Sequence, residues 1–142
     1  MHQLSEIRTK VEELAKLVGA NQHQLPTYGK SRDFGYSHVE VDKFSYHLVT
    51  VERGQELERK STTELDELLY YIFLDATSDI AGNFELNNRI EDQDGRRIAF
   101  SKQIELMYLL SSDFGKKVEL YLLKILEKYP YDDELIKKLN QS

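Results

Sequence analysis

The sequence predicts an α+β fold, in which a small antiparallel sheet of two or three strands packs with about five helices. Several segments repeat apolar residues at the spacing of an α-helix, whereas residues 36–53 alternate apolar and polar side chains with a period of two. No repeat and no linker of biased composition divides the 142 residues. We therefore expect a single domain over residues 1–142.

The stretch Ser61–Arg89 has the strongest helical pattern. Ser61 and Glu64 have the spacing of a capping box, which predicts the start of the helix. Eight apolar residues share one face: Leu65, Leu68, Leu69, Ile72, Phe73, Ala76, Ile80 and Phe84. The opposite side carries Glu64, Glu67, Tyr71, Asp75 and Glu85. A charged helix face is usually only solvated, but here it also suits a basic protein partner.

The N-terminal residues 3–18 predict an amphipathic helix that ends at Gly19, where a left-handed cap is needed. Residues 20–35 contain Pro26 and Gly29 and predict a loop. Tyr28 and Phe34 are large for a loop, so we expect both side chains to hold it against the core.

Residues 36–53 predict a β-hairpin with a turn at Asp42–Ser45. The pattern places His47 on the same face as the valines, and that face is expected to pack on the helices, with His38 pointing the other way. The four valines of that face are Val39, Val41, Val49 and Val51. Gly54 allows a second tight turn, after which residues 56–61 predict a third strand.

The C-terminal part predicts three helices. The first runs from about residue 97 to residue 110, and the second is capped by Ser112 or Asp113 and stopped by Pro130. A short last helix is capped by Asp132 or Asp133.

The composition excludes several classes of protein. There is no cysteine, which excludes disulfide scaffolds, thiol catalysis and cysteine-based zinc sites. No apolar run reaches the length of a membrane span and no signal-peptide core is visible, so we expect a cytoplasmic protein. Residues 61–100 hold nine acids and three arginines, which accounts for the whole net charge of −6. Such a chain disfavours nucleic acid and anionic membranes as partners and favours a basic protein.

One cluster of residue types suits catalysis or a metal: His38, Glu40, His47, Glu52, Arg53 and Glu56. The predicted register sets the two histidines on opposite faces, and a strand histidine near carboxylates is more often a structural hydrogen-bonding residue. Asp92 and Asp94 before Gly95 resemble a calcium loop too loosely to predict one. Arg96 and Arg97 suit either an anion or, as the favoured interpretation, salt bridges to the acidic central helix.

Five segments, in this order, resemble the immunity protein 63 family of bacterial polymorphic toxin systems. They are LPTYG (25–29), HVEVD…YHLVTVERGQELER (38–59), LDELLYYIFLDAT (65–77), ELNNRIEDQDGRRIAFSKQIELM (85–107) and KYPYDD (128–133). The resemblance implies a small cytoplasmic protein that binds and neutralises a cognate toxin, with no catalysis, cofactor or metal. It leaves the toxin's chemistry open, with nucleases as one class, and identifies no functional residue.

Physical reasoning adds a hypothesis for the toxin-binding surface, because nucleases bind phosphates with basic surfaces that an acidic inhibitor can fill. Its residues are Glu64, Glu67, Tyr71, Asp75, Glu85, Glu91, Asp92 and Asp94. The hairpin with Glu52, Arg53 and Glu56 is the second candidate contact. Two alternatives remain open: a small metal-dependent enzyme using His38 and His47 with Glu52 and Glu56, and a regulatory protein-binding module.

Overall fold

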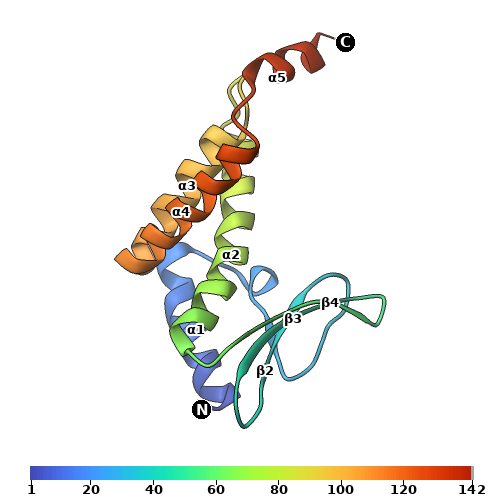
Figure 1. Ribbon diagram of the computed structural model, residues 1–142, viewed down its shortest axis with the longest axis vertical. Helices are drawn as coiled ribbons and strands as arrows, with labels where there is room; N and C mark the ends of the chain where they lie inside the picture. Colours follow the sequence, from blue (N-terminus) through green and yellow to red (C-terminus); the bar gives the residue numbers. More distant parts are fainter. Residues whose placement is uncertain (142) are drawn as a thin grey trace. The chain divides into compact units, whose positions relative to one another are not determined.

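The computed structural model describes residues 1–141 and has an α+β fold with five α-helices and a four-stranded mixed sheet (Figure 1). The chain forms two compact units, one from Met1 to Ala76 and one that begins at Thr77. Helix α2 (Leu65–Asn87) contributes residues to both. Among residues 1–141, no helix is long and apolar enough to cross a membrane.

The first unit begins with α1 (Leu4–Val18), which agrees with the predicted helix. Its buried face carries Ile7, Val11, Ala15 and Val18, the spacing that the sequence predicts. Gly19 ends the helix with a φ of 70°, and its N–H donates to the Ala15 carbonyl. The glycine is needed there because a side chain disfavours this left-handed conformation.

The loop after α1 contains a 3₁₀ turn at Gln22–Gln24 and a short strand, β1 (Thr27–Tyr28). Strand β1 pairs in parallel with β2 (Ser37–Val41), so the sheet is mixed and has one strand more than predicted. A two-residue strand shows no alternation, so the sequence pattern missed it. Tyr28 is half-buried as expected, but Phe34 is 83% exposed, so the expectation that it holds the loop against the core was wrong.

Strands β2, β3 (Tyr46–Glu52) and β4 (Gln55–Thr62) form an antiparallel meander, and β4 is the predicted third strand. The turn at residues 42–45 pairs Val41 with Tyr46, and hence Val39 with Leu48. Directly paired residues share a face, so Val39 and Val49 lie on opposite faces. The prediction that the four valines share one face was therefore wrong, because the predicted register was off by one residue.

The two faces of the sheet have different roles. The face with Val39 and Leu48 meets the helices: Lys60, which pairs with Leu48, lies with its Nζ 5.4 Å from the ring centre of Tyr71 on α2. The opposite face, which we call the histidine face, carries His38, Glu40, His47, Val49 and Arg59. The two histidines thus share a face, contrary to the predicted register.

Helix α2 begins later than the predicted capping box. Ser61 belongs to β4, and its hydroxyl oxygen lies 2.6 Å from Nδ1 of His47. The Glu64 carbonyl accepts from the Leu68 N–H, while the Glu64 N–H donates to Oγ1 of Thr62. Ser61, which the local sequence pattern assigns to the helix cap, is therefore part of the paired strand β4 instead.

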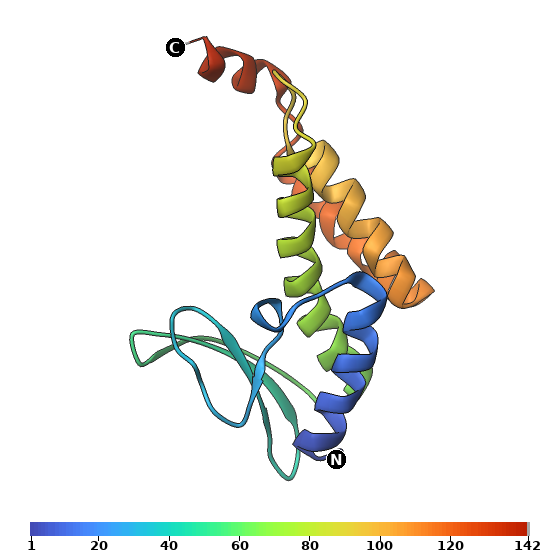
Figure 2. The same ribbon diagram turned by 180° about the vertical axis from the view of Figure 1, so that it is seen from behind.

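The second unit contains the end of α2, α3 (Arg96–Leu110), α4 (Ser112–Lys128) and α5 (Asp133–Asn140). Helices α3 and α4 lie side by side (Figure 2). The Ser111 hydroxyl caps α4 by accepting from the Phe114 N–H, one residue before the predicted caps. Asp132 caps α5 as predicted, accepting from the Leu135 N–H.

Candidate functional site

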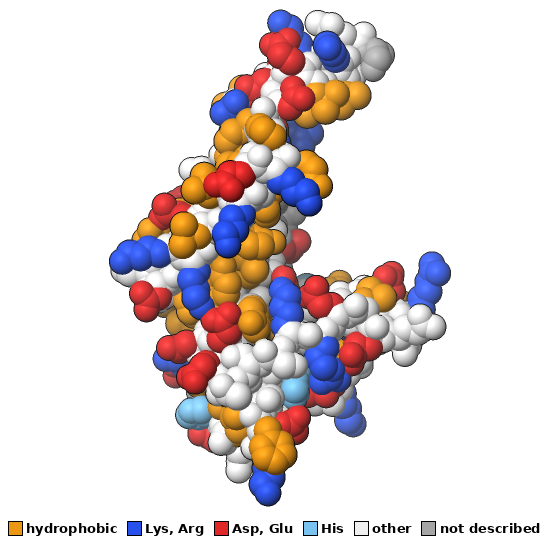
Figure 3. All heavy atoms as spheres, in the orientation of Figure 1, with side chains coloured by type: hydrophobic (Ala, Val, Ile, Leu, Met, Phe, Trp, Pro, Cys, Tyr) orange, Lys and Arg blue, Asp and Glu red, His pale blue; other side chains and the backbone are white. Residues whose placement is uncertain are grey.

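The predicted partner-binding residues divide equally between the two units. Glu64, Glu67, Tyr71 and Asp75 belong to the first unit, and Glu85, Glu91, Asp92 and Asp94 to the second. The first four follow one side of α2, which we call the acidic row. Glu64 and Asp75 are exposed, whereas Glu67 and Tyr71 are partly exposed. On the face visible in Figure 3, acidic and basic side chains of the first unit are interspersed.

Tyr71 is held within the acidic row by its neighbours. Partial burial raises the pKa of its phenol, and a hydrogen bond with Glu67 acts in the same direction. The Lys60 ammonium stacks over the ring from β4. Tyr71 is therefore held between the carboxylates of the acidic row with part of its ring exposed.

Glu85 is used inside the second unit. Its side chain is only 6% exposed, and both carboxylate oxygens lie 2.9 Å from guanidinium nitrogens of Arg89. Those hydrogen bonds lower the pKa of Glu85. The side chain also lies against Gly95, where a Cβ atom would fall 2.4 Å from Oε1.

Asp94 is likewise an internal acceptor and is 7% exposed. It accepts from the guanidinium and backbone N–H of Arg96, and from the Asp132 N–H at 3.1 Å. Its bonds to Arg96, followed by those from the backbone, lower the pKa of Asp94 to about 2. Arg96 in turn donates to the carbonyls of Tyr129 and Pro130, at 2.8 Å each.

These contacts join the loop before α3 to the loop before α5. Asp133 completes the junction by accepting from the Asp94 N–H and from Arg97. The prediction that Arg96 and Arg97 form salt bridges to the central helix was therefore wrong, because they pair with Asp94 and Asp133. The segments DGRR and KYPYDD form one structural junction.

The other two predicted contact acids of the second unit differ from each other. Asp92 has a left-handed φ of 63°, and its carboxylate accepts from Nδ2 of Asn140 at 3.1 Å. Glu91 is exposed to solvent. Of the four predicted contact acids in this unit, Glu91 is the one whose side chain is most exposed.

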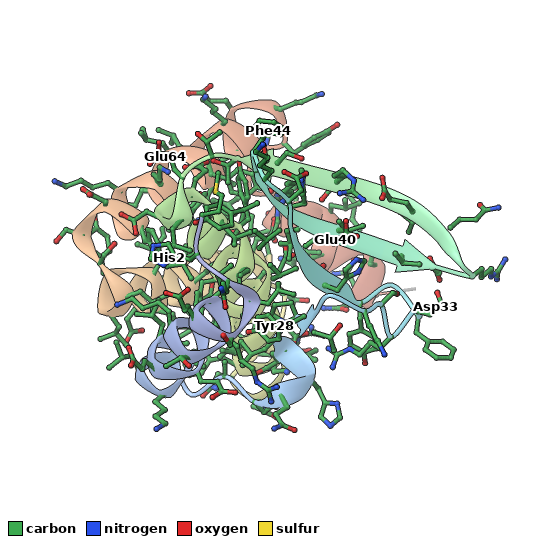
Figure 4. The ribbon with its side chains drawn as sticks, turned by 90° about the horizontal axis from the view of Figure 1, so that it is seen from below. His2, Tyr28, Asp33, Glu40, Phe44 and Glu64 are labelled. Atoms are coloured by element: carbon green, nitrogen blue, oxygen red, sulfur yellow. The ribbon has the colours of Figure 1, made fainter. Side chains whose placement is uncertain are left out.

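The histidine face contains two hydrogen-bonded groups. In the first, Nε2 of His38 lies 2.6 Å from Glu40, and Arg59 bridges Glu40 and Glu56. Glu40, on this face, is labelled in Figure 4. Hydrogen bonds from His38 and, to a smaller extent, Arg59 lower the pKa of Glu40. Arg59 was not recognised in the sequence because only the strand register brings it beside these acids.

In the second group, His47 lies between Asp42 and Ser61, with its ring nitrogens 2.7 Å and 2.6 Å from their side-chain oxygens. Glu52 and Arg53 lie at the β3–β4 turn, where Glu52 pairs with Gln55. Within the described residues, no three or more His, Cys, Asp or Glu side chains are grouped to hold a metal ion. On the histidine face, ion pairs and hydrogen bonds thus join residues within and between strands β2, β3 and β4.

A family model described as immunity protein 63 matches residues 42–122, which is more than half of the chain. The match begins at the β2–β3 turn and ends within α4. It includes all eight residues of the predicted partner-binding surface. No curated protein and no solved structure matches the chain.

Proposed function

The chain belongs to the immunity protein 63 family, and from that premise we propose that it binds a cognate toxin protein in the cytoplasm and neutralises it without catalysing a reaction. The family match over residues 42–122 carries this proposal, and it agrees with the resemblance seen in the sequence. The acidic balance of residues 61–100 gives independent support, since it favours a basic protein as partner.

The acidic row is the part of the proposed contact surface best suited to meet such a partner. Glu64 and Asp75 are exposed at two ends of the row, and Tyr71 supplies rigid aromatic area between them. A toxin that cleaves nucleic acid needs cations to bind phosphates, and carboxylates can occupy the same positions. Opposite charge also speeds association, to about 10⁸–10⁹ M⁻¹s⁻¹ in steered complexes.

The proposed surface is not uniform. The carboxylates of Glu85 and Asp94 form ion pairs with Arg89 and Arg96. We therefore expect these two residues to affect toxin binding through long-range charge and not through direct contact. Direct contact is expected from the acidic row and from Glu91. A nuclease is the toxin class that this charge distribution fits best.

The first test is co-expression with the product of the adjacent gene, which the proposal requires to be the toxin. Rescue of growth, together with a one-to-one complex of the purified proteins, is the expected result. A chain that neither rescues growth nor binds this toxin domain would refute the proposed function.

The acidic row is tested by Glu67→Lys/Asp75→Lys. The matched control is Glu13→Lys/Glu127→Lys, which changes the net charge equally at two exposed acids outside the proposed surface. We expect the first variant to bind at least about 30-fold more weakly, mostly through slower association at low salt, and the control to change little. Equal losses in both variants would mean that net charge, and not the acidic row, governs binding.

A further inference from the structure

Left-handed backbone is concentrated where one loop meets the β3–β4 turn. Asp33 and Phe34 have φ values of 57° and 58°, and Arg53 has a φ of 54°. They are three of the four non-glycine residues with positive φ in the described part of the chain. This conformation is unfavourable for a bulky side chain such as phenylalanine. Such strain tends to collect where a protein binds or reacts.

Hydrogen bonds hold the two strained segments together. Both Asp33 carboxylate oxygens accept from the Gly54 N–H, at 3.2 Å and 3.3 Å. The Gly35 N–H donates to the Val51 carbonyl at 2.8 Å, so the loop continues beside β3. Figure 4 shows Asp33 at the opposite end of the sheet from Phe44. We call Asp33, Phe34, Gly35, Arg53 and Gly54 the Phe34–Arg53 tip.

The strained backbone at Phe34 and Arg53 does not bury either side chain. Phe34 is 83% exposed, more than any other large hydrophobic side chain described. Arg53 is exposed and has no ion-pair partner in residues 1–141. Beside them the Arg32 guanidinium stacks 3.9 Å from the centre of the half-exposed Tyr36 ring. The loop and the β3–β4 turn thus present one aromatic and one cationic side chain to solvent.

We propose that the Phe34–Arg53 tip is a docking site for the cognate toxin, an inference that rests on the proposed function. Phe34 enters an apolar pocket of the toxin, and Arg53 pairs with a carboxylate at the rim of that pocket. The occupant is a protein, because the immunity protein 63 family implies a protein toxin as partner. Aromatic residues and arginine dominate binding energy at protein interfaces, and a preorganised loop loses little entropy on binding.

The tip and the acidic row have separate tasks in this proposal. Carboxylates of the acidic row act at a distance and speed the encounter. The tip acts only on contact, so it slows dissociation of the complex. The contribution of Phe34 to binding should not change with salt concentration. This difference lets the two contacts be measured independently.

The test measures binding of the purified product of the adjacent gene, the toxin in the proposed function, along with thermal unfolding of the free chain. Phe34→Ala should weaken binding about 30-fold or more, chiefly by faster dissociation, with unchanged unfolding. Phe34→Asn should weaken binding equally but raise the unfolding midpoint by roughly 2–4 °C, because asparagine tolerates left-handed backbone. Arg53→Asn should likewise unfold at a higher temperature and dissociate faster.

Phe44→Ala is the matched control, since Phe44 is 72% exposed at a hairpin turn and has no positive φ. We expect it to bind the toxin domain normally. Unchanged binding by Phe34→Ala, or an equal loss in Phe44→Ala, would overturn the inference while leaving the proposed function intact. Failure of the unaltered chain to bind or neutralise the toxin domain would overturn both. A fall in thermal stability on Phe34→Asn would show that Phe34 has a structural role, and this result would also overturn the inference.

Discussion

Replacing Asp94 by asparagine tests the junction between the loops before α3 and α5. The substitution keeps the shape of the side chain but removes the charge that accepts from Arg96 and from the Asp132 N–H. The pKa of Asp94 lies at about 2 in the folded chain, against an ordinary value of 3.8. At about 1.4 kcal/mol per pKa unit, the ionised carboxylate contributes about 2 kcal/mol to stability. Solvent screens little of this, because the side chain is buried.

The sign of the pH dependence follows from the lowered pKa. Between pH 2 and pH 3.8 the unfolded chain binds a proton at Asp94 that the folded chain does not, so stability rises with pH. The contribution is complete above about pH 5 and is lost progressively as the pH falls towards 2. Asp94→Asn should therefore be less stable by about 2 kcal/mol at pH 7, and the difference should shrink at low pH.

Urea unfolding followed by circular dichroism from pH 3 to pH 7 measures this difference. Glu13→Gln serves as the control, because it neutralises an exposed carboxylate with no ion pair in the described residues. It should leave the free energy of unfolding within about 0.5 kcal/mol of the unaltered chain. A constant difference for Asp94→Asn across this pH range would refute the reasoning, as would a loss no larger than that of the control.

Two further predictions concern the helix pair and the hairpin turn. Gly115→Ala should destabilise the chain by roughly 1–3 kcal/mol in urea unfolding, because a Cβ atom would lie 2.3 Å from Cγ of Tyr108; unchanged stability would mean that the ring moves aside freely. The carboxyl of Asp42 should titrate with a pKa of about 2 by NMR, chiefly because His47 bonds to it. His47→Ala should raise that pKa towards 3.8, and a value that stays low would assign the shift to the turn backbone instead.

The sequence predicted the elements that local patterns specify. The cap at Gly19 and the cap at Asp132 were both correct, because a helix end depends on a few neighbouring residues. Strands β2 and β3 were found from their alternation, and β4 was expected after the turn that Gly54 allows. The two-residue β1 was missed because so short a strand shows no alternation, and its pairing with His38 and Val39 is visible only in the structure.

The candidate surface was predicted less completely than the fold. Periodicity placed Glu64, Glu67 and Asp75 on one side of α2, where they are exposed or partly exposed. It also placed Glu85 there, but that side chain is covered near Gly95 and paired with Arg89. Helical periodicity gives the direction of a side chain and says nothing of the loop that covers it.

The sequence by itself determined the family, the α+β class and the acidic balance, since each of these depends on residue types and their order along the chain. Only the tertiary structure decided which charges are free to meet a partner. Asp94 and Arg96 neutralise each other beside the loop at Tyr129, and Phe34 stays in solvent on left-handed backbone. The physical reason is that pairing and exposure depend on contacts between segments distant in the chain, where a shift of one residue in register reverses the face that a side chain occupies.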